Sequence, residues 1–564
     1  HYRQELVDRS PDLPFLFSGG SRAKIYGMTS SGHANGEADN DKKSLVSAYF
    51  SSERFMRPSP ALVLALAAFA SITYAKEKPN IVLIMVDDMG WSDIGPYGAE
   101  IIQTPNLDKL AANGLRFRQF YNNAKCTTTR ATLLTGLYPR QGGRGIELLN
   151  DQMVTLGEAM NLAGYQTGIS GKWHNGSRKP HRPFDRGFEQ SYGLWDGACN
   201  FFDPTIQDPQ FKGSRKRVFG QNDKLITEFP KGYYLTDAFT DNAIRMINEF
   251  STNEAPYLLY VPYTAPHYPL HAKPKDIAKY KGKFSKGWDD LQERRHQKTL
   301  ELGLVSPEWK LPPRDPEAQS WNNAKNKYWQ NLRMEVYAAM IDNVDQNIGR
   351  IISAVEKSGE ANNTLILFLS DNGSCAESPG GENNVAHIPG PKEYYSHVGP
   401  SWAYAQNAPF RRYKSRMHEG GIATPLIAYW PKVIPKNSFT NQIGHIIDFL
   451  PTFLEMGEGS YPTKYRGKSI LPAEGISLLS VFKSPSETIT RRKPLYWFFS
   501  GNRAIREGDW KLVWDQKVKK WELYNLTNDR TEMYDLAGKK PTLVKQLRIR
   551  WEKWAHKTDV NYKN

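Results

Sequence analysis

The run IVLIMVDDMG, Ile81–Gly90, places six apolar residues directly before two carboxylates. Continuous apolar runs rich in β-branched residues are typical of parallel strands that are covered on both faces. A second run of the same design, Leu365–Leu369, is followed by Ser370, Asp371 and Asn372. The sequence therefore predicts an α/β fold in which two buried strands each end in acidic or amide side chains.

Four oxygen-bearing side chains follow these two strands: Asp87, Asp88, Asp371 and Asn372. In open α/β sheets, ligands bind at the carboxyl ends of the strands. Carboxylate and amide oxygens suit a hard divalent cation, Ca²⁺ more readily than Zn²⁺, and a cation relieves the repulsion between adjacent carboxylates. Each segment alone also fits an ordinary strand-ending turn, and spacing alone does not show that the two segments converge.

A cysteine-containing segment, Lys125–Gly136, lies between the two strands in the sequence. Cys126 is followed by three threonines, by Arg130 and by an apolar run that stops at Gly136. This pattern predicts a loop that enters a helix, with Cys126 near the helix N-terminus. Unpaired backbone N–H groups and the helix dipole favour an anion there, and Arg130 adds a bidentate donor. Without its surroundings, Cys126 would be interpreted as a small buried core residue.

The segment resembles the sulfatase signature Cys-x-Pro-Ser-Arg followed by Thr-Gly, and the resemblance extends over most of the chain. In that family a maturation enzyme oxidises the cysteine to formylglycine (3-oxoalanine), whose hydrate is the nucleophile. Thr128 stands where proline is usual, and Thr129, where serine is usual, keeps a hydroxyl. The resemblance implies an alkaline-phosphatase-like core, with a mostly parallel sheet flanked by helices and a smaller C-terminal α+β subdomain that contains an antiparallel sheet.

Further basic residues lie in family motifs. Gly171–His174 resembles a Gly-Lys-Trp-His motif, His267 ends an Ala-Pro-His motif, and Lys414 lies in a stretch similar to the one whose lysine contacts sulfate. Outside such motifs, a loop histidine is more often structural and a lysine merely solvated. The resemblance implies this catalytic set: Cys126, Arg130, Lys172, His174, His267 and Lys414. It implies one Ca²⁺ per chain, held by the following positions: Asp87, Asp88, Asp371, Asn372 and the formylglycine at 126.

The resemblance also implies roles in sulfate ester hydrolysis. Calcium, Arg130 and Lys172 hold the formylglycine hydrate, and calcium and Lys414 neutralise charge on the transferring group. His267 protonates the departing oxygen as general acid, and His174 takes the proton that restores the aldehyde.

Weaker candidates lie in segments that we interpret as loops lining a substrate pocket: His181, His271, His397 and Trp402. We expect the loops at 200–230 and 270–330 to determine which alcohol carries the sulfate.

The composition of the 564-residue chain, 39% hydrophobic and 12% aromatic, fits a folded protein rather than a disordered one. The net charge of +15 favours anionic partners through long-range steering. A sulfated polysaccharide fits this charge and an exported protein, whereas nucleic acid does not fit export; surface charge that serves only solubility is the alternative. Three cysteines are too few for a disulfide framework, so Cys199 and Cys375 either pair or stay reduced.

The chain divides into four parts by pattern. The first part is polar, and the second has a basic start, the apolar run Ala61–Ala70 and a small-residue cleavage site at Thr73–Ala75, as in secretory signal peptides. We therefore expect a periplasmic or secreted protein without a membrane anchor; a membrane-anchored N-terminal stem is the alternative. The expected parts are an N-terminal extension that is non-native or disordered (1–55), a signal peptide (56–75), a catalytic domain (76–480) and a C-terminal subdomain (481–564).

Two other functions fit the same residues. A phosphate or phosphonate ester hydrolase of the same superfamily would use the same nucleophile. A non-catalytic binder of sulfated glycans would need the basic surface but not an oxidised Cys126.

Overall fold

The computed structural model describes residues 78–139, 141, 149–379, 381, 384–560 and 562. The expected N-terminal extension (1–55) and signal peptide (56–75) lie outside the described residues. Lys76–Asn564 forms one compact unit. Within the described part, no helix has both the length and the apolar character that crossing a bilayer requires.

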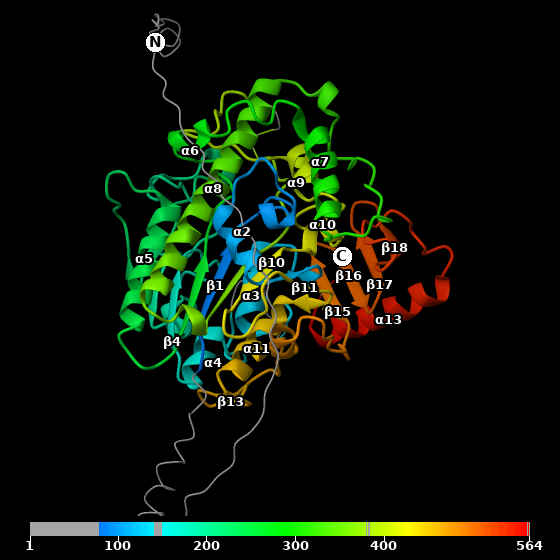
Figure 1. Cartoon of the computed structure of the whole chain (residues 1–564). Helices are drawn as coiled ribbons and strands as arrows, with labels where there is room; N and C mark the ends of the chain where they lie inside the picture. The colour runs from blue at the N-terminus through cyan, green and yellow to red at the C-terminus, as the bar shows by residue number, and fades with distance from the viewer. Residues whose placement is uncertain are drawn as a thin grey trace, which may run out of the picture. The chain divides into compact units, whose positions relative to one another are not determined.

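A ten-stranded sheet lies at the centre of the described residues (Figure 1). Its order is β11-β2-β10-β9-β1-β8-β4-β5-β6-β7. The five central strands β9, β1, β8, β4 and β5 run parallel, and β10, β6 and β7 are antiparallel to their neighbours. The bounds are β1 (Asn80–Val86), β2 (Leu115–Phe117), β4 (Gln166–Ser170), β5 (Gln190–Leu194), β6 (Phe219–Gln221), β7 (Lys224–Leu225), β8 (Tyr257–Pro262), β9 (Thr364–Ser370), β10 (Leu426–Tyr429) and β11 (Ser438–Thr440).

Strand β1 is buried on both faces, as the sequence predicts. Val82, Ile84 and Val86 belong to a core that includes three helices: α2 (Pro105–Ala112), α5 (Leu235–Phe250) and α8 (Lys327–Lys357). Ile81 and Leu83 belong to a second core that includes three others: α3 (Cys126–Thr135), α4 (Leu156–Leu162) and α11 (Phe449–Met456). Because helices cover both faces, the strand is continuously apolar.

The two strands that end in carboxylates are neighbours. In the β1–β9 register, Val86 lies opposite Ser370, so Asp87 and Asp371 both follow the last paired position. The α/β interpretation and the predicted strands are therefore confirmed.

The C-terminal region contains a four-stranded antiparallel sheet, orange to red in Figure 1. Its strands are β15 (Leu495–Phe499), β16 (Asn502–Glu507), β17 (Trp510–Asp515) and β18 (Lys520–Asn525). Helix α13 (Pro541–Lys557) packs against this sheet through the buried residues Leu547 and Trp551. This sheet confirms the expected C-terminal architecture, while the boundary at residue 480 stays a prediction.

The sequence pattern over Thr440–Met456 suggests one amphipathic helix, and this interpretation is wrong. The helix begins only at Phe449, because Asp448 Oδ2 accepts a hydrogen bond from His445 N at 2.8 Å and holds a turn before it. The remaining α-helices and strands are β3 (Phe120–Tyr121), α6 (Pro274–Ala278), α7 (Gly287–Glu301), α9 (Pro400–Gln406), α10 (Glu419–Ile422), β12 (Gly444–His445), β13 (Lys464–Tyr465), β14 (Lys468–Ser469) and α12 (Leu479–Lys483).

Candidate active site

The ends of β1 and β9 bring the four predicted oxygen ligands together. Asn372 Nδ2 donates a hydrogen bond to Asp88 Oδ1 at 2.7 Å, and Asp88 N donates to Asp371 Oδ1 at 3.3 Å. Asp88 has a φ of 65°, a left-handed conformation that turns the chain after β1. Asp87, Asp371 and Asn372 are fully buried, and Asp88 is 2% exposed.

Three oxygens in this group accept no hydrogen bond: Asp87 Oδ1, Asp88 Oδ2 and Asn372 Oδ1. A buried polar atom without a partner costs about 1–3 kcal/mol. Asp87, Asp88 and His267 can each offer one ligand atom, and these three atoms lie within 4.8 Å of one another. The unpartnered oxygens and the acidic donor set therefore fit a hard divalent cation.

Arg130 and Lys172 neutralise part of the acidic charge. Arg130 Nη2 lies 2.8 Å from Asp371 Oδ2 and 3.6 Å from Asp87 Oδ2, and Lys172 Nζ pairs with Asp87 Oδ2. Burial, and then the charge of Asp87, raise the pKa of Asp371 to about 7. Burial also acts to raise the pKa of Asp87, but the charges of Lys172, His267 and Arg130 outweigh it and lower that pKa. The two carboxylates thus compete for the same cations, and a further cation would stabilise both.

Lys414 and His267 flank Asp88 on different oxygens. Lys414 Nζ lies 2.5 Å from Asp88 Oδ1, and His267 Nε2 lies 3.4 Å from Asp88 Oδ2. His267 Nδ1 lies 2.6 Å from Tyr268 O, so Nδ1 donates and Nε2 faces the carboxylate. Burial lowers the pKa of His267 to about 4. Burial also acts to lower the pKa of Lys414, but the charge of Asp88 outweighs it and keeps this pKa high, so the lysine stays charged.

We call the buried acidic and amide side chains at this sheet edge, together with the three cations that contact them, the Asp87 cluster. Its members are Asp87, Asp88, Asp371, Asn372, Arg130, Lys172 and Lys414.

Helix α3 begins at Cys126, as predicted, and its first turn is tied to the end of β9. Thr129 Oγ1 donates to Asp371 O at 2.6 Å, so the hydroxyl retained at this position links the two elements. Thr128 Oγ1 donates to Asn123 O at 2.8 Å. In the first turn of a helix a backbone N–H needs no intrahelical partner, so the helix geometry accepts either threonine or proline at position 128.

His174 lies in the loop after β4, half-buried and with a φ of 60°. Its Nδ1 has no hydrogen-bond partner. Burial, and then the charge of Lys172, lower the pKa of His174 well below its usual value. A Cβ atom at Gly197 would lie 2.5 Å from the imidazole, so the glycine leaves space for the ring. Asn175 Nδ2 donates to Thr127 O at 3.5 Å and so joins this loop to α3.

Two of the weaker histidine candidates border the site. His181 lines a cavity of about 450 Å³ together with His174. His397 lines a much smaller cavity with His267 and Asp88.

The other two weaker candidates are structural. His271 is fully buried, with Nε2 2.7 Å from Tyr394 O. Trp402 lies in α9 rather than in a loop, and its ring centroid is 5.3 Å from that of Trp288. The expectation that these two residues line a pocket is therefore wrong, because remote segments bury them.

Sequence reasoning missed Cys375 and Glu377, which line the small cavity beside His267. Glu377 Oε1 lies 2.6 Å from Lys125 Nζ. Two features of the sequence could have pointed to these residues. Both closely follow β9, and Lys125, the partner of Glu377, is next to Cys126. All three cysteines, Cys126, Cys199 and Cys375, are free and buried, so Cys199 and Cys375 do not pair.

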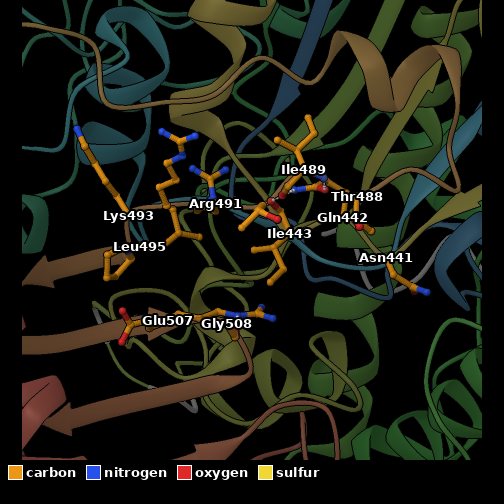
Figure 2. Close-up of a pocket in the computed structure, with 14 residues that line it drawn as sticks. Asn441, Gln442, Ile443, Thr488, Ile489, Arg491, Lys493, Leu495, Glu507 and Gly508 are labelled. Carbon is orange, nitrogen blue, oxygen red and sulfur yellow. Dashed lines mark hydrogen bonds between the residues drawn. The ribbon is translucent and has the colours of Figure 1, made fainter.

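A separate cavity of about 270 Å³ lies between residues 488–495 and the end of β16 (Figure 2). Arg491, which lines it, pairs with Asp448. Arg506, on the opposite wall, donates to Gln119 Oε1 at 2.6 Å. These arginines are used in packing, and no predicted site residue lines the cavity, so it is not the candidate active site.

Comparisons with known proteins agree with the fold. The family model named Sulfatase matches residues 79–459, and the model described as N-sulphoglucosamine sulphohydrolase, C-terminal, matches residues 410–557. The arylsulfatase of Klebsiella aerogenes is 31% identical over 79% of this chain and 99% of its own length. The N-acetylgalactosamine-6-sulfatase of Sus scrofa is 28% identical over 85% of this chain and 79% of its own.

Among solved structures, that of Ps i-CgsB in complex with k-i-k-neocarrahexaose has a TM-score of 0.63 and 26% identity, covering 86% of this chain and 94% of that one. The sulfatase model matches most of this chain. The similarity to the arylsulfatase covers nearly the whole length of that enzyme. This chain belongs to the sulfatase family of the alkaline phosphatase superfamily and is a sulfuric ester hydrolase.

Proposed function

We propose that this sulfatase hydrolyses sulfate esters on glycans with a formylglycine at position 126 and one Ca²⁺ ion. The observation that carries the proposal is the set of three unpartnered oxygens, on Asp87, Asp88 and Asn372, at the sheet edge where α3 presents Cys126. A buried acidic group with unused acceptors favours cation binding, whereas a purely structural ion cluster would pair its oxygens internally.

Four side chains would hold the cation together with the oxygen at position 126: Asp87, Asp88, Asp371 and Asn372. When bound, the cation supplies positive charge that offsets the carboxylates and favours anionic oxygens nearby. Formylglycine, as its hydrate, supplies a nucleophilic oxygen that an unmodified thiol does not, since only the hydrate can expel sulfate and return to the aldehyde.

The basic residues of this chain would orient and neutralise the reacting groups. Arg130 and Lys172 are buried basic side chains close to Asp87, so they are suited to holding an anionic oxygen of residue 126. Lys414 remains charged because of Asp88 and would bind an oxygen of the sulfate. Held in fixed positions in a site that excludes water, these cations stabilise developing negative charge more than solvent would.

Two histidines would move protons. His267 donates from Nδ1 to Tyr268 O, which leaves Nε2 to carry a proton to the departing oxygen. A bound sulfate anion favours the protonated form and so opposes the effect of burial on this pKa. His174 has a free Nδ1 and a low pKa, so it would accept the proton from the hydroxyl of residue 126.

A glycan substrate is supported by charge and by relatives. The net charge of +15 favours polyanions. The N-acetylgalactosamine-6-sulfatase is named for a sugar sulfate, and Ps i-CgsB was solved with a hexaose. We carry this substrate class over to this chain, together with export and modification of Cys126 by a formylglycine-generating enzyme.

The test is sulfate release from defined sulfated oligosaccharides, measured on protein whose residue 126 has been characterised by peptide mass spectrometry. We expect release only from the fraction that carries formylglycine, and loss of release when Ca²⁺ is chelated. Sulfate and phosphate esters of one alcohol should be compared in the same assay. Faster hydrolysis of the phosphate ester would favour the phosphate ester hydrolase, and glycan binding without any turnover would favour the non-catalytic binder.

A further inference from the structure

A basic cavity of about 450 Å³ adjoins the candidate active site. Arg178 and Lys179 reach it from the loop after β4, and Arg215 and Arg217 from the segment before β6. Asp196 is the one carboxylate among its lining residues. Cavities of roughly 300–1,000 Å³ are typical of small-ligand sites, so this one is large enough for a sugar ring that carries a charged group.

Three of the four basic side chains that line this cavity form no ion pair within the described residues. Arg178, Lys179 and Arg215 are exposed and form no ion pair with any carboxylate of the described residues. Arg217 is different, because it pairs with Asp208 at 2.5 Å. Three like charges around one cavity repel each other, and an anion between them would relieve that repulsion.

His174 belongs both to the lining of this cavity and to the candidate active site. This histidine lines the cavity, and its Nδ1 is buried without a partner. The next residue, Asn175, contacts Thr127 O in the first turn of α3, beside Cys126. The cavity is therefore placed to contact another part of a glycan whose sulfate ester lies beside residue 126.

We propose that this cavity binds a second anionic group, a sulfate or a carboxylate, of the glycan whose sulfate ester is cleaved. The inference rests on the proposed function and narrows its substrate class to glycans with at least two anionic groups. Arg178 and Arg215 are free to form bidentate hydrogen bonds to either group, which makes them specificity-determining residues rather than catalytic ones.

The test compares matched oligosaccharides that carry one sulfate, two sulfates, or one sulfate and one carboxylate. The test variant is Arg178→Gln with Arg215→Gln. The control variant is Lys545→Gln with Arg492→Gln, which also removes two exposed positive charges, one in α13 and one beside the separate cavity of Figure 2.

The wild type and the control should prefer at least one dianionic substrate by about tenfold or more in kcat/KM, the contribution of one or two charge-assisted hydrogen bonds. The test variant should lose this preference while its kcat/KM on the monosulfated substrate changes less than about twofold, because these arginines do not contact the reacting sulfate. The dianionic substrate for which the test variant loses the preference shows whether the second group is a sulfate or a carboxylate.

Equal rates on all three substrates in the wild type, or an unchanged preference in the test variant, overturn the inference. No sulfate release from any substrate contradicts the proposed function instead. The cavity is then tested by calorimetric binding of the dianionic oligosaccharides to the Cys126→Ala protein, with and without Arg178→Gln and Arg215→Gln. Weaker binding of about tenfold in the cavity variant supports the inference, and equal affinity overturns it.

Discussion

Two buried groups of charged residues in this sulfatase differ in how their oxygens are paired. In the Asp87 cluster, three oxygens accept no hydrogen bond. In the second group, Glu419 uses both of its oxygens: Oε1 lies 2.8 Å from Lys511 Nζ, and Oε2 lies 2.7 Å from Arg530 Nε and 2.8 Å from Tyr121 OH. We call this second group, completed by Glu532, the Glu419 cluster. Glu419, Lys511, Arg530 and Tyr121 are all 1% exposed or less.

The Glu419 cluster joins the C-terminal sheet to the core. Lys511 lies in β17, whereas Glu419 begins the short helix α10, five residues after Lys414. Glu419 N also donates to Glu532 Oε2 at 2.8 Å. Burial of charge is thus no sign of chemistry by itself, because each carboxylate oxygen of Glu419 and Glu532 lies 2.7–2.9 Å from a cation or an N–H donor and the cluster serves structure. The Asp87 cluster differs because Asp87 Oδ1 and Asn372 Oδ1 accept no hydrogen bond, and Asp88 Oδ2 has only His267 Nε2 nearby among the described residues, at 3.4 Å.

The largest expected effect is on turnover and concerns Cys126. Cys126→Ala should reduce kcat on a sulfate ester by at least about 10⁴-fold, because the nucleophile is lost. Its free energy of unfolding should change by less than about 1 kcal/mol, since a small buried side chain is replaced by a smaller one. Rates and denaturant midpoints measured on the same preparation check both numbers. A fully active wild-type fraction that contains only unmodified Cys126 would contradict the role assigned to this position.

The second prediction concerns the leaving group. His267→Ala should lose about 10²–10⁴-fold in kcat/KM on a sugar sulfate, the usual range for general acid catalysis, and much less on an activated aryl sulfate. A sugar alkoxide is a strong base and needs a proton as the S–O bond breaks, whereas a nitrophenolate needs little help. The measurement is kcat/KM across leaving groups of graded acidity. An equal loss on every substrate would make His267 a sulfate-binding residue.

The third prediction concerns the stability that the Glu419 cluster contributes to the fold. Glu419→Gln should lower the free energy of unfolding by about 3–5 kcal/mol, because Lys511 and Arg530 would stay buried with too little negative charge. Urea unfolding measures this loss. Any increase in stability produced by Ca²⁺ should be the same as in the wild type. A loss below about 1 kcal/mol would show that this cluster is not what ties the C-terminal sheet to the core.

The smallest expected effect is the increase in the free energy of unfolding that Ca²⁺ produces at the Asp87 cluster. Ca²⁺ at 100 times its Kd should stabilise the wild type by about 2.7 kcal/mol, since it binds only the folded state. Asp87→Asn should remove this increment as well as turnover. The increment is the difference between unfolding with Ca²⁺ and with chelator for each variant, so the loss of the Asp87–Lys172 pair cancels. An unchanged increment would mean that Ca²⁺ binds elsewhere.

Predictions from local pattern were confirmed where one segment carried the signal. The apolar runs before Asp87 and before Asp371 form strands, and the segment from Cys126 forms a helix. The pocket interpretation of His271 and Trp402 was wrong, because both are buried by residues remote in sequence, such as Tyr394 for His271 and Trp288 for Trp402.

By itself, the sequence determined the buried strands, the Cys126 helix start and the residues that resemble sulfatase motifs, because backbone periodicity and local hydrogen bonding act over a few residues. Only the tertiary structure decided which carboxylates are paired. Glu419 meets Lys511 across 92 residues, and Asn372 meets Asp88 across 284. The tertiary structure likewise placed Arg178 and Arg215 around one cavity. Such contacts follow from the order of strands in the sheet and from the packing of remote segments, and no local preference of the chain encodes them.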